Sequence, residues 1–402
     1  MPTREEGSRE NPPRRQGRDD RPLKVLYVHH APMAGGACES LLSLLRHLPP
    51  EVAGTLLSPP GGALSVPGAA GRADLRPVSP LQLHWSLSPA VLLKARADLA
   101  RLSQEILRAQ KAFAADLIHA NTWPAALAAT QARLGGVPVI WHVRDLRIRP
   151  VVLNRLGGQA SDCIAISRAV REFLLAQGAA PERVHLVYNG LDREEFRPRR
   201  SRDEVRQELG LPAEARVMMA VGDLVTWKRH DLLLEAAAIL QARVPDLLLV
   251  VVGGHGERHE QRRSELEKLA QDLGVAGMVR FTGHREDVAD LLQACDVFVH
   301  AALDEPFGRV VLEAMALGRP VVVYDAAGPG ELVRNEVSGL AVTPVGSAEA
   351  LAGGVLRMLT EPDLALRCGE QARERVAAEF TADRMAAETV ALYRRVLERS
   401  EA

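Results

Sequence analysis

Short apolar runs alternate with longer stretches of helical periodicity along most of the chain. The first run, Leu23–Val28, is followed by a glycine-containing loop and by a helical pattern over residues 40–48. Continuous apolar strands separated by helices are typical of parallel sheets covered on both faces. Further strands are expected at residues 53–57, 116–120, 137–143 and 163–166, with helices at residues 89–113, 124–134 and 167–177.

The alternation breaks at residues 196–215, a stretch rich in Arg, Pro and Glu that we interpret as an interdomain linker. The sequence therefore predicts two doubly wound, Rossmann-like α/β domains facing a cleft, with ligands at the carboxyl ends of the strands. Residues 23–197 form the first domain, residues 198–380 the second, and residues 381–402 a final helix. The strands expected in the second domain lie at residues 217–221, 247–252, 279–281, 297–300, 321–324 and 340–342, with a helix at residues 229–243.

Composition narrows the functional classes. The net charge is −1, which gives no reason to expect nucleic-acid binding. Four scattered cysteines without CxxC spacing argue against a disulfide framework or a zinc cluster and fit a reducing compartment. No apolar run reaches the roughly 20 residues that cross a bilayer. Residues 1–22 mix charges with few large apolar side chains, so we expect a cytoplasmic protein with a disordered tail there and no signal peptide.

Metal chemistry finds no support in the sequence. His29, His30, His84 and His119 do not form a spaced ligand set, and no DxD-like acidic pair follows a suitable strand. The sequence therefore predicts neither a metal nor a resident cofactor.

The segment EPFGRVVLEAMALGRPVV, residues 305–322, is the strongest local signal. It follows an expected strand and opens a helix at about Gly308, where unpaired N–H groups and the helix dipole suit a diphosphate. Glu313, one to two turns into this helix, can accept hydrogen bonds from ribose hydroxyls, and Glu305 can reach a sugar ring beyond the phosphates. The alternative is an ordinary amphipathic helix with two solvated glutamates.

This segment resembles the signature of glycosyltransferase family 4, the retaining transferases with the two-domain GT-B fold. Two glutamates separated by seven residues, with FG after the first and EAMA around the second, carry the resemblance. It implies a GT-B architecture and a last helix that crosses back to the first domain. Further passages in the family's order are VYNGLDREEFRP (187–198), AVGDLVTWKRHDLLLEAAAIL (220–240), VVVGGHGERHE (250–260), VRFTGHREDVADLLQACDVFV (279–299) and AGPGELVRNEVSGLAVTP (327–344).

The resemblance also implies roles for single residues. Lys228 would contact the donor diphosphate, assisted by the backbone of Gly308 and Arg309. Glu313 would hold the ribose, and Glu305 the transferred sugar.

Other implied contacts lie outside this segment. His142, at the end of an expected strand, matches the family's histidine that touches the donor sugar, and the alternative is a bond to nearby backbone groups. Gly35 and Gly36 match the N-terminal glycine loop that approaches the phosphates and the acceptor. The remaining donor-binding residues implied by the resemblance are Gly254, Phe307, His284 and Arg285, the last two near the base.

One position departs from the family pattern. Where the family usually has Arg five residues before the lysine, this chain has Asp223. A carboxylate facing a diphosphate would cost about 1 to 4 kcal/mol for charges about 4 Å apart. We expect Arg229 or Arg309 to supply the missing charge, because Lys228 and both glutamates remain. The alternatives are that Asp223 points away and that donor binding is weakened or lost.

The implied function is transfer of a sugar from a nucleoside diphosphate to an acceptor hydroxyl with retention, with Glu305, His142 and Lys228 as the catalytic residues. The nucleotide sugar is a co-substrate, and the acceptor is a glycan, a lipid-linked molecule or a small molecule. One alternative is a sugar-nucleotide epimerase or phosphorylase on the same fold. The other is a family member that has lost catalysis and serves as a binding subunit, which Asp223 alone favours.

Two helices carry further expectations. In the last helix, Met385, Thr389, Leu392 and Val396 recur at helical spacing, which predicts core packing. The helix at residues 89–113 is basic on part of its surface. We interpret this basic surface either as a solvated face or as a site of peripheral contact with anionic lipid at the inner face of the plasma membrane. Its basic residues are Lys94, Arg96, Arg101, Arg108 and Lys111.

Overall fold

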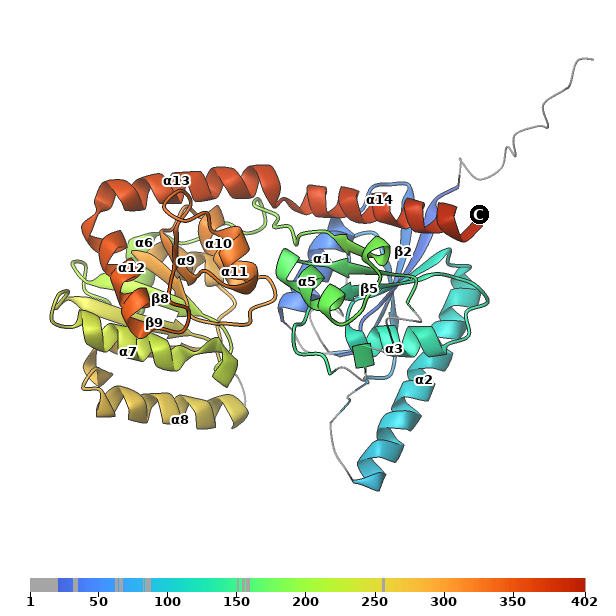
Figure 1. The fold of residues 1–402 in the computed structure, drawn as a ribbon, viewed down its shortest axis with the longest axis horizontal. Helices are drawn as coiled ribbons and strands as arrows, with labels where there is room; N and C mark the ends of the chain where they lie inside the picture. The colour runs from blue at the N-terminus through green and yellow to red at the C-terminus, as the bar shows by residue number, and fades with distance from the viewer. Residues whose placement is uncertain are drawn as a thin grey trace, which may run out of the picture.

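Two parallel sheets, each covered by helices, form the framework of the protein (Figure 1). The computed structural model describes residues 21–31, 35–61, 64, 68–81, 83, 88–149, 152–153, 156, 160–254 and 257–401. Among these residues, the first sheet has the strand order β3-β2-β1-β4-β5-β6-β7 and the second has the order β10-β9-β8-β11-β12-β13. The predicted pair of doubly wound α/β units is thereby confirmed at the level of the fold.

The N-terminal half builds the first sheet. β1 pairs in parallel with both β2 and β4, and its residues Val25–Val28 are fully buried because the strand has neighbours on both sides and helices on both faces. β3 and β7 are not expected from the sequence, because these short edge strands lack a continuous apolar run. The elements are β1 (Leu23–Val28), α1 (Gly36–Arg46), β2 (Val52–Ser58), β3 (Asp74–Pro77), α2 (Pro89–Phe113), β4 (Leu117–Ala120), α3 (Trp123–Gln131), β5 (Val139–Val143), β6 (Asp162–Ala165), α5 (Arg168–Ala176) and β7 (Val184–Leu186).

The C-terminal half repeats this construction. β8 and β9 pair along their whole length, and the apolar residues of β9 are buried between α7 and the neighbouring strands. The elements are α6 (Arg202–Glu208), β8 (Arg216–Val221), α7 (His230–Leu240), β9 (Leu247–Val252), α8 (Glu257–Asp272), β10 (Val279–Gly283), α9 (Val288–Ala294), β11 (Val297–His300), α10 (Arg309–Ala316), β12 (Val321–Tyr324), α11 (Ala327–Leu332), β13 (Leu340–Val342), α12 (Ala348–Thr360), α13 (Pro362–Glu379) and α14 (Ala382–Glu401).

The last two helices join the halves: α13 runs along the second half and α14 along the first (Figure 1). At the crossing, the N–H of Leu191 donates to the carbonyl of Phe380 (2.9 Å), and the N–H of Ala382 donates to the carbonyl of Leu191 (3.2 Å). A Cβ on Gly190 would lie 2.2 Å from the carbonyl oxygen of Thr381. Only glycine fits this approach, which gives the NG pair of residues 189–190 a structural reason.

The predicted core packing of the last helix is confirmed. Met385, Thr389, Leu392 and Val396 of α14 are each at most 1% exposed. Three of them join the apolar core formed by α1 and the near face of the first sheet. The C-terminal helix is therefore an integral part of the first half.

Residues 196–215 are more ordered than the predicted linker. They contain α6, whose capping box joins Ser201 and Glu204: the Glu204 N–H donates to Ser201 Oγ, and the Ser201 N–H donates to Glu204 Oε2 at 2.7 Å. Val205 of this helix is fully buried. The charged residues of this stretch form ion pairs with the second half, such as Arg200 Nε with Asp290 Oδ2 at 3.1 Å. Composition alone therefore does not reveal the helix.

Candidate active site

The carboxyl ends of β8 and β11 meet where the second sheet reverses its strand order. The two strands pair in parallel, with β9 and β12 on their outer sides. In doubly wound sheets this switch point is where ligands bind. Lys228 follows β8 and Glu305 follows β11, and Lys228 Nζ lies 2.5 Å from Glu305 Oε2. The fold thus brings together two of the three predicted catalytic residues.

The Lys228–Glu305 pair is shielded from water and ionised. Each side chain is 13% exposed. Burial would raise the pKa of Glu305, but Lys228 and His300, whose Nε2 lies 3.5 Å from Glu305 Oε2, outweigh it and lower the pKa to about 2. The site therefore contains a carboxylate and an ammonium group that hold each other in position.

Helix α10 begins beside this pair. Gly308 precedes it with φ of 89°, in the left-handed region that favours glycine, and a Cβ there would lie 3.1 Å from Pro329 Cγ. The first N–H groups of a helix have no partner within it. Glu313 is 7% exposed and accepts a hydrogen bond from Arg309 Nε at 2.8 Å, and burial raises its pKa. Glu305 and Glu313 are both shielded, so the alternative of two solvated glutamates is wrong.

The first sheet gathers a second polar cluster at its own switch point, between β1 and β4. Asn121 follows β4 and donates from Nδ2 to His29 Nδ1 at 3.1 Å. Arg144 follows β5 and donates from Nε to Asn121 Oδ1 at 2.9 Å. Its Nη1 donates to Ser40 Oγ at 2.8 Å and to Asn189 Oδ1 at 2.9 Å. Polar loop residues therefore stand at the switch point of each sheet, where ligands bind in doubly wound folds.

Arg144 carries its charge without a carboxylate partner. Within the described part of the chain, its hydrogen-bond acceptors are hydroxyl, amide and imidazole groups, all of them neutral. Burial lowers the pKa of Arg144 to about 9, and the charge of Arg309 acts in the same direction. The start of α10 is therefore close enough for its arginine to act on a residue of the first half.

His142, the third predicted catalytic residue, is fully buried at the end of β5. Arg144 Nη2 can only donate, and it lies 3.2 Å from His142 Nδ1. His142 Nδ1 is therefore the acceptor, and the ring proton of His142 lies on Nε2. His119 Nε2, 3.1 Å from His142 Nδ1, must then donate as well, and its own Nδ1 accepts from Tyr393 OH at 2.6 Å. Burial lowers the pKa of both histidines, which are neutral.

The network therefore leaves one buried donor, the Nε2–H of His142, without an acceptor among the described residues. A buried donor without an acceptor is costly unless a ligand uses it. The alternative interpretation of His142, a partner for nearby backbone groups, finds no bond to support it in the same part of the chain.

Replacing Tyr393 by phenylalanine tests this chain of hydrogen bonds. We expect Tyr393→Phe to lower the free energy of unfolding by about 1–3 kcal/mol, because it leaves the buried Nδ1 of His119 without a donor. Tyr27→Phe is the matched control: Tyr27 is also fully buried, but its hydroxyl has Tyr393 as its neighbour, so its loss leaves the bond from Tyr393 OH to His119 Nδ1 in place. Denaturant unfolding of both variants measures the difference, and equal losses would contradict the network.

Two contacts fix the halves against each other beside the site. Ser167 Oγ, in the first half, donates to the carbonyl of Pro306 at 2.6 Å. Glu331 of α11 caps α5 of the other half, since its carboxylate oxygens accept from the N–H groups of Arg168 (2.8 Å) and Ala169 (2.6 Å). A carboxylate at a helix N-terminus is stabilised by the helix dipole. The loop that carries Glu305 is thereby anchored to the N-terminal half.

Comparison with known proteins agrees with this geometry. Residues 34–195 match the family described as Glycosyltransferase Family 4, and residues 201–375 match the family described as Glycosyl transferases group 1. The alpha-maltose-1-phosphate synthase of Mycolicibacterium smegmatis is 30% identical over 88% of this chain and 98% of its own length. The chain belongs to glycosyltransferase family 4. This confirms the resemblance read from its motifs.

Other relatives of this glycosyltransferase support the same assignment. The D-inositol 3-phosphate glycosyltransferase 1 of Catenulispora acidiphila is 32% identical over 70% of this chain and 73% of its own length. The crystal structure of Anabaena HepE in complex with UDP-glucose superposes with a TM-score of 0.78, at 26% identity, over 92% of this chain and 99% of that one. The expected GT-B fold is thereby confirmed.

Asp223, the position at which this glycosyltransferase departs from the family pattern, lies at the surface. Asp223 is exposed, and its carboxylate forms no hydrogen bond or ion pair with a described residue. Both arginines expected to compensate already have carboxylate partners. Arg229 Nη2 lies 2.8 Å from Asp231 Oδ2, and Arg309 Nε lies 2.8 Å from Glu313 Oε1.

The loop expected near the base follows β10. Its Arg285 donates to Asp287 Oδ1 at 2.8 Å and to Glu208 Oε1 at 2.7 Å, and these hydrogen bonds raise the pKa of the arginine. The guanidinium is therefore held against α6 and the start of α9. His284, the neighbouring residue, is exposed in the same loop.

The remaining predicted residues differ in their surroundings. Gly35 and Gly36 start α1, where a Cβ on either would meet no atom within 4 Å. Gly254 follows β9 with φ of 94°, and a Cβ there would lie 3.0 Å from the side chain of Leu224. Phe307 is 3% exposed and packs its ring against aromatic neighbours, so its side chain supports the loop from inside.

Sequence reasoning missed several polar residues of the site. Arg144, Asn121 and His300 each stand at or directly after the carboxyl end of a buried strand. A polar residue in that position was the available signal, since parallel strands deliver their carboxyl ends to the ligand-binding edge. Trp227 and Arg147 carried no comparable signal, because their contact joins loops from different halves.

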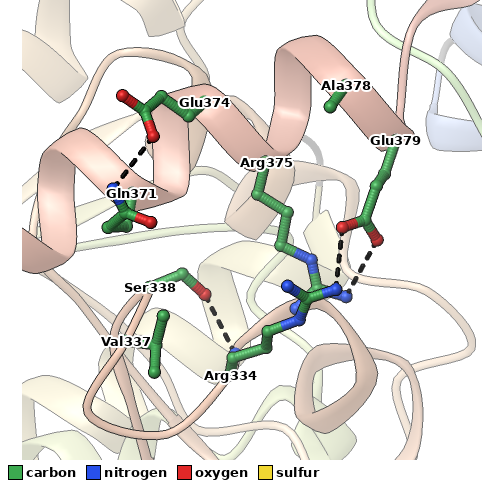
Figure 2. A pocket seen from close by; sticks show the side chains of 8 residues that line it. All are labelled: Arg334, Val337, Ser338, Gln371, Glu374, Arg375, Ala378 and Glu379. Atoms are coloured by element: carbon green, nitrogen blue, oxygen red, sulfur yellow. Dashed lines mark hydrogen bonds and ion pairs between the residues drawn. The ribbon is translucent and has the colours of Figure 1, made fainter.

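A cavity of about 190 Å³ lies elsewhere, between α13 and the segment after α11 (Figure 2). Figure 2 shows the side chains of Arg334 and Arg375 converging on Glu379, with Nη2–Oε distances of 2.8 Å and 3.4 Å. Arg375 Nη2 also donates to the carbonyl of Glu331 at 3.2 Å, which ties α13 to α11. None of the predicted site residues lines this cavity.

Within the described ranges, no helix combines the length and apolar character needed to cross a membrane. In the same ranges, no three His, Cys, Asp or Glu side chains gather as metal ligands.

Proposed function

We propose that this glycosyltransferase moves a sugar from a nucleoside diphosphate to an acceptor hydroxyl with retention of anomeric configuration. The observation that carries the proposal is the shielded Lys228–Glu305 pair, 2.5 Å apart, at the switch point of the second sheet and beside the start of α10. A diphosphate can bind an ammonium group and the N–H groups at a helix start, and Lys228 and α10 supply these two kinds of donor. Retention follows from family membership alone.

Each residue has a role in this proposal. Lys228 and the first N–H groups of α10 stabilise the negative charge that develops on the departing diphosphate. Glu305 accepts hydrogen bonds from the transferred sugar, and Glu313 accepts them from the ribose. His142 donates its unused Nε2–H to a sugar oxygen. Closure of the two halves on the donor then excludes water and limits hydrolysis.

A panel of nucleotides tests the donor class. We expect at least one of UDP, GDP, ADP and dTDP, or its sugar, to stabilise the protein, by about 2.7 kcal/mol at 100 times its dissociation constant. UDP is the first candidate, because HepE has been solved with UDP and with UDP-glucose. Thermal unfolding of the full chain measures the effect. A protein that none of them stabilises would be a binding subunit without a donor site, and the proposal would fail.

Product analysis separates the remaining rivals. A transferase releases the nucleoside diphosphate only when an acceptor is supplied, whereas an epimerase converts the nucleotide sugar without one. A phosphorylase requires inorganic phosphate and a lysine-bound pyridoxal phosphate, which gives an absorbance band in the purified protein. The anomeric coupling constant of the product, measured by NMR, decides between retention and inversion.

We also propose that α2 contacts anionic lipid. Its first turns project from the first half (Figure 1), and Leu92 and Leu93 are 48% and 71% exposed beside Lys94 and Arg96. Double replacement of both leucines by glutamate should reduce cosedimentation with vesicles of phosphatidylglycerol and phosphatidylcholine severalfold. Leu366→Glu, at a 65% exposed leucine of α13, is the control. Equal binding by all three proteins would refute the contact.

A further inference from the structure

The cations that the second half brings to the expected diphosphate position are already neutralised. Lys228 pairs with Glu305, Arg229 with Asp231 and Arg309 with Glu313, at distances of 2.5, 2.8 and 2.8 Å. Asp223 adds a further negative charge nearby. A diphosphate brings two or more negative charges of its own, so this half offers it little net attraction.

Arg147 is a cation of the opposite half that lacks such a partner. It lies in the loop after β5 and is exposed, and it forms no ion pair with a carboxylate among the described residues. Its guanidinium carbon lies 3.9 Å from the ring centre of Trp227, in the loop after β8. A guanidinium over an indole face is held by attraction to the ring and keeps its N–H groups available at the edge.

Trp227 also places Arg147 next to the lysine of the donor site. Lys228 Nζ lies 4.5 Å from the same ring centre. The separation of the two cations cannot exceed the sum of 3.9 Å and 4.5 Å, a span that one diphosphate can bridge with an oxygen toward each. The indole therefore sets the spacing of a lysine from one half and an arginine from the other.

We propose that Arg147, held on Trp227, supplies the second positive charge for the donor diphosphate that position 223 does not supply. This inference rests on the proposed function, because it needs a diphosphate beside Lys228. It assigns a binding role to a residue of the N-terminal half. The donor then links the two halves through its phosphates, so that its binding and the closure of the site become one event.

The arginine cannot be exchanged freely for a lysine in this role. A guanidinium stacks on the indole and donates two parallel hydrogen bonds to phosphate oxygens, whereas an ammonium group does neither as well. We therefore expect Arg147→Lys to bind UDP with an affinity between those of the wild type and Arg147→Ala. Trp227→Ala should weaken UDP binding as Arg147→Ala does, since it removes the surface on which the guanidinium rests.

A rescue experiment tests the proposal. UDP binding to the full chain is measured by isothermal titration calorimetry, with GDP, ADP and dTDP as further probes. Arg147→Ala should weaken UDP binding at least about tenfold, equivalent to 1.4 kcal/mol. Arg149→Ala removes the same charge from an exposed residue of the same loop and should stay within about twofold of the wild type.

Adding Asp223→Arg to Arg147→Ala should restore most of the lost affinity. The side chain of Lys228 packs 3.5 Å from the position of a Cβ on Gly222, so residue 223 is adjacent to the lysine. If the Arg147–Trp227 contact were only a clasp between the halves, a charge at position 223 could not replace it. Failure of the rescue would therefore overturn the proposal, and so would equal losses in the Arg147 and Arg149 variants.

The outcomes also separate this inference from the proposed function. If Lys228→Ala loses UDP binding while Arg147→Ala retains it, the inference is wrong and the donor site stands. If none of the four diphosphates binds the wild type, both are wrong. Melting temperatures of the variants confirm that each remains folded.

Discussion

Lys228→Ala is expected to lower the rate of sugar transfer by at least about 10²–10³ and to weaken nucleotide binding. Removing one preorganised group that stabilises developing charge typically has an effect of this size. The variant also leaves Glu305 beside the diphosphate without its lysine partner, and His300 Nε2 then lies 3.5 Å from its carboxylate. The remaining carboxylate would repel the phosphates, so both binding and chemistry should suffer.

The measurement is release of nucleoside diphosphate in the presence of acceptor, together with calorimetric titration of UDP. The control is Lys268→Ala in α8, which removes a lysine whose Nζ lies 2.6 Å from Asp272 in an exposed pair. Exposed pairs of this kind contribute at most about 1 kcal/mol, so the control should keep wild-type activity. A Lys228→Ala enzyme with a wild-type rate would remove Lys228 from the donor site.

The alternation of apolar runs and helical stretches was enough to predict both sheets. Buried parallel strands leave a local signature, because their residues face helices on both sides and are apolar without interruption. β3 and β7 have no such signature, since they lie at sheet edges and are short. The helix α6 was missed for the opposite reason: its charged residues form ion pairs with loops beside α9, such as Arg202 Nη2 with Asp296 Oδ1 at 2.7 Å, and composition alone resembles a linker.

The site was predicted only in part. Lys228 lies in one local motif, and Glu305 and Glu313 lie in another. The fold brings the two motifs together at one switch point. The contacts that join the halves cannot be read from local patterns. Glu331 caps a helix that begins at Arg168, 163 positions earlier, and the tautomer of His142 depends on Arg144 and on Tyr393 of the last helix.

Asp223 is a second case in which sequence motifs do not locate the residue that completes the site. The resemblance to the family shows that a cation is missing at this position, and the motifs offer two candidates to replace it, Arg229 and Arg309. The structure shows that Arg229 is neutralised by a carboxylate two residues later in the chain and Arg309 by one four residues later. A compensating charge therefore has to come from a distant part of the chain, where only the folded arrangement reveals it.

Glu305→Gln is expected to separate binding from catalysis. The carboxylate of Glu305 lies 2.5 Å from Lys228 Nζ, so a diphosphate must compete with it for the ammonium group. Neutral glutamine removes that competitor while keeping the shape of the side chain. We expect the variant to bind UDP as tightly as the wild type or up to about tenfold more tightly, a gain of at most 1.4 kcal/mol.

Transfer by the same variant should nevertheless fall by about 10² or more, because the carboxylate that contacts the sugar near the reacting carbon is lost. Glu313→Gln is the comparison, since a weaker acceptor for the ribose should reduce UDP affinity instead of raising it. The two glutamates of one motif would then respond in opposite directions. A loss of UDP affinity in Glu305→Gln as large as that in Lys228→Ala would instead mean that the diphosphate binds the ion pair as a unit, with Glu305 holding Lys228 in place for it.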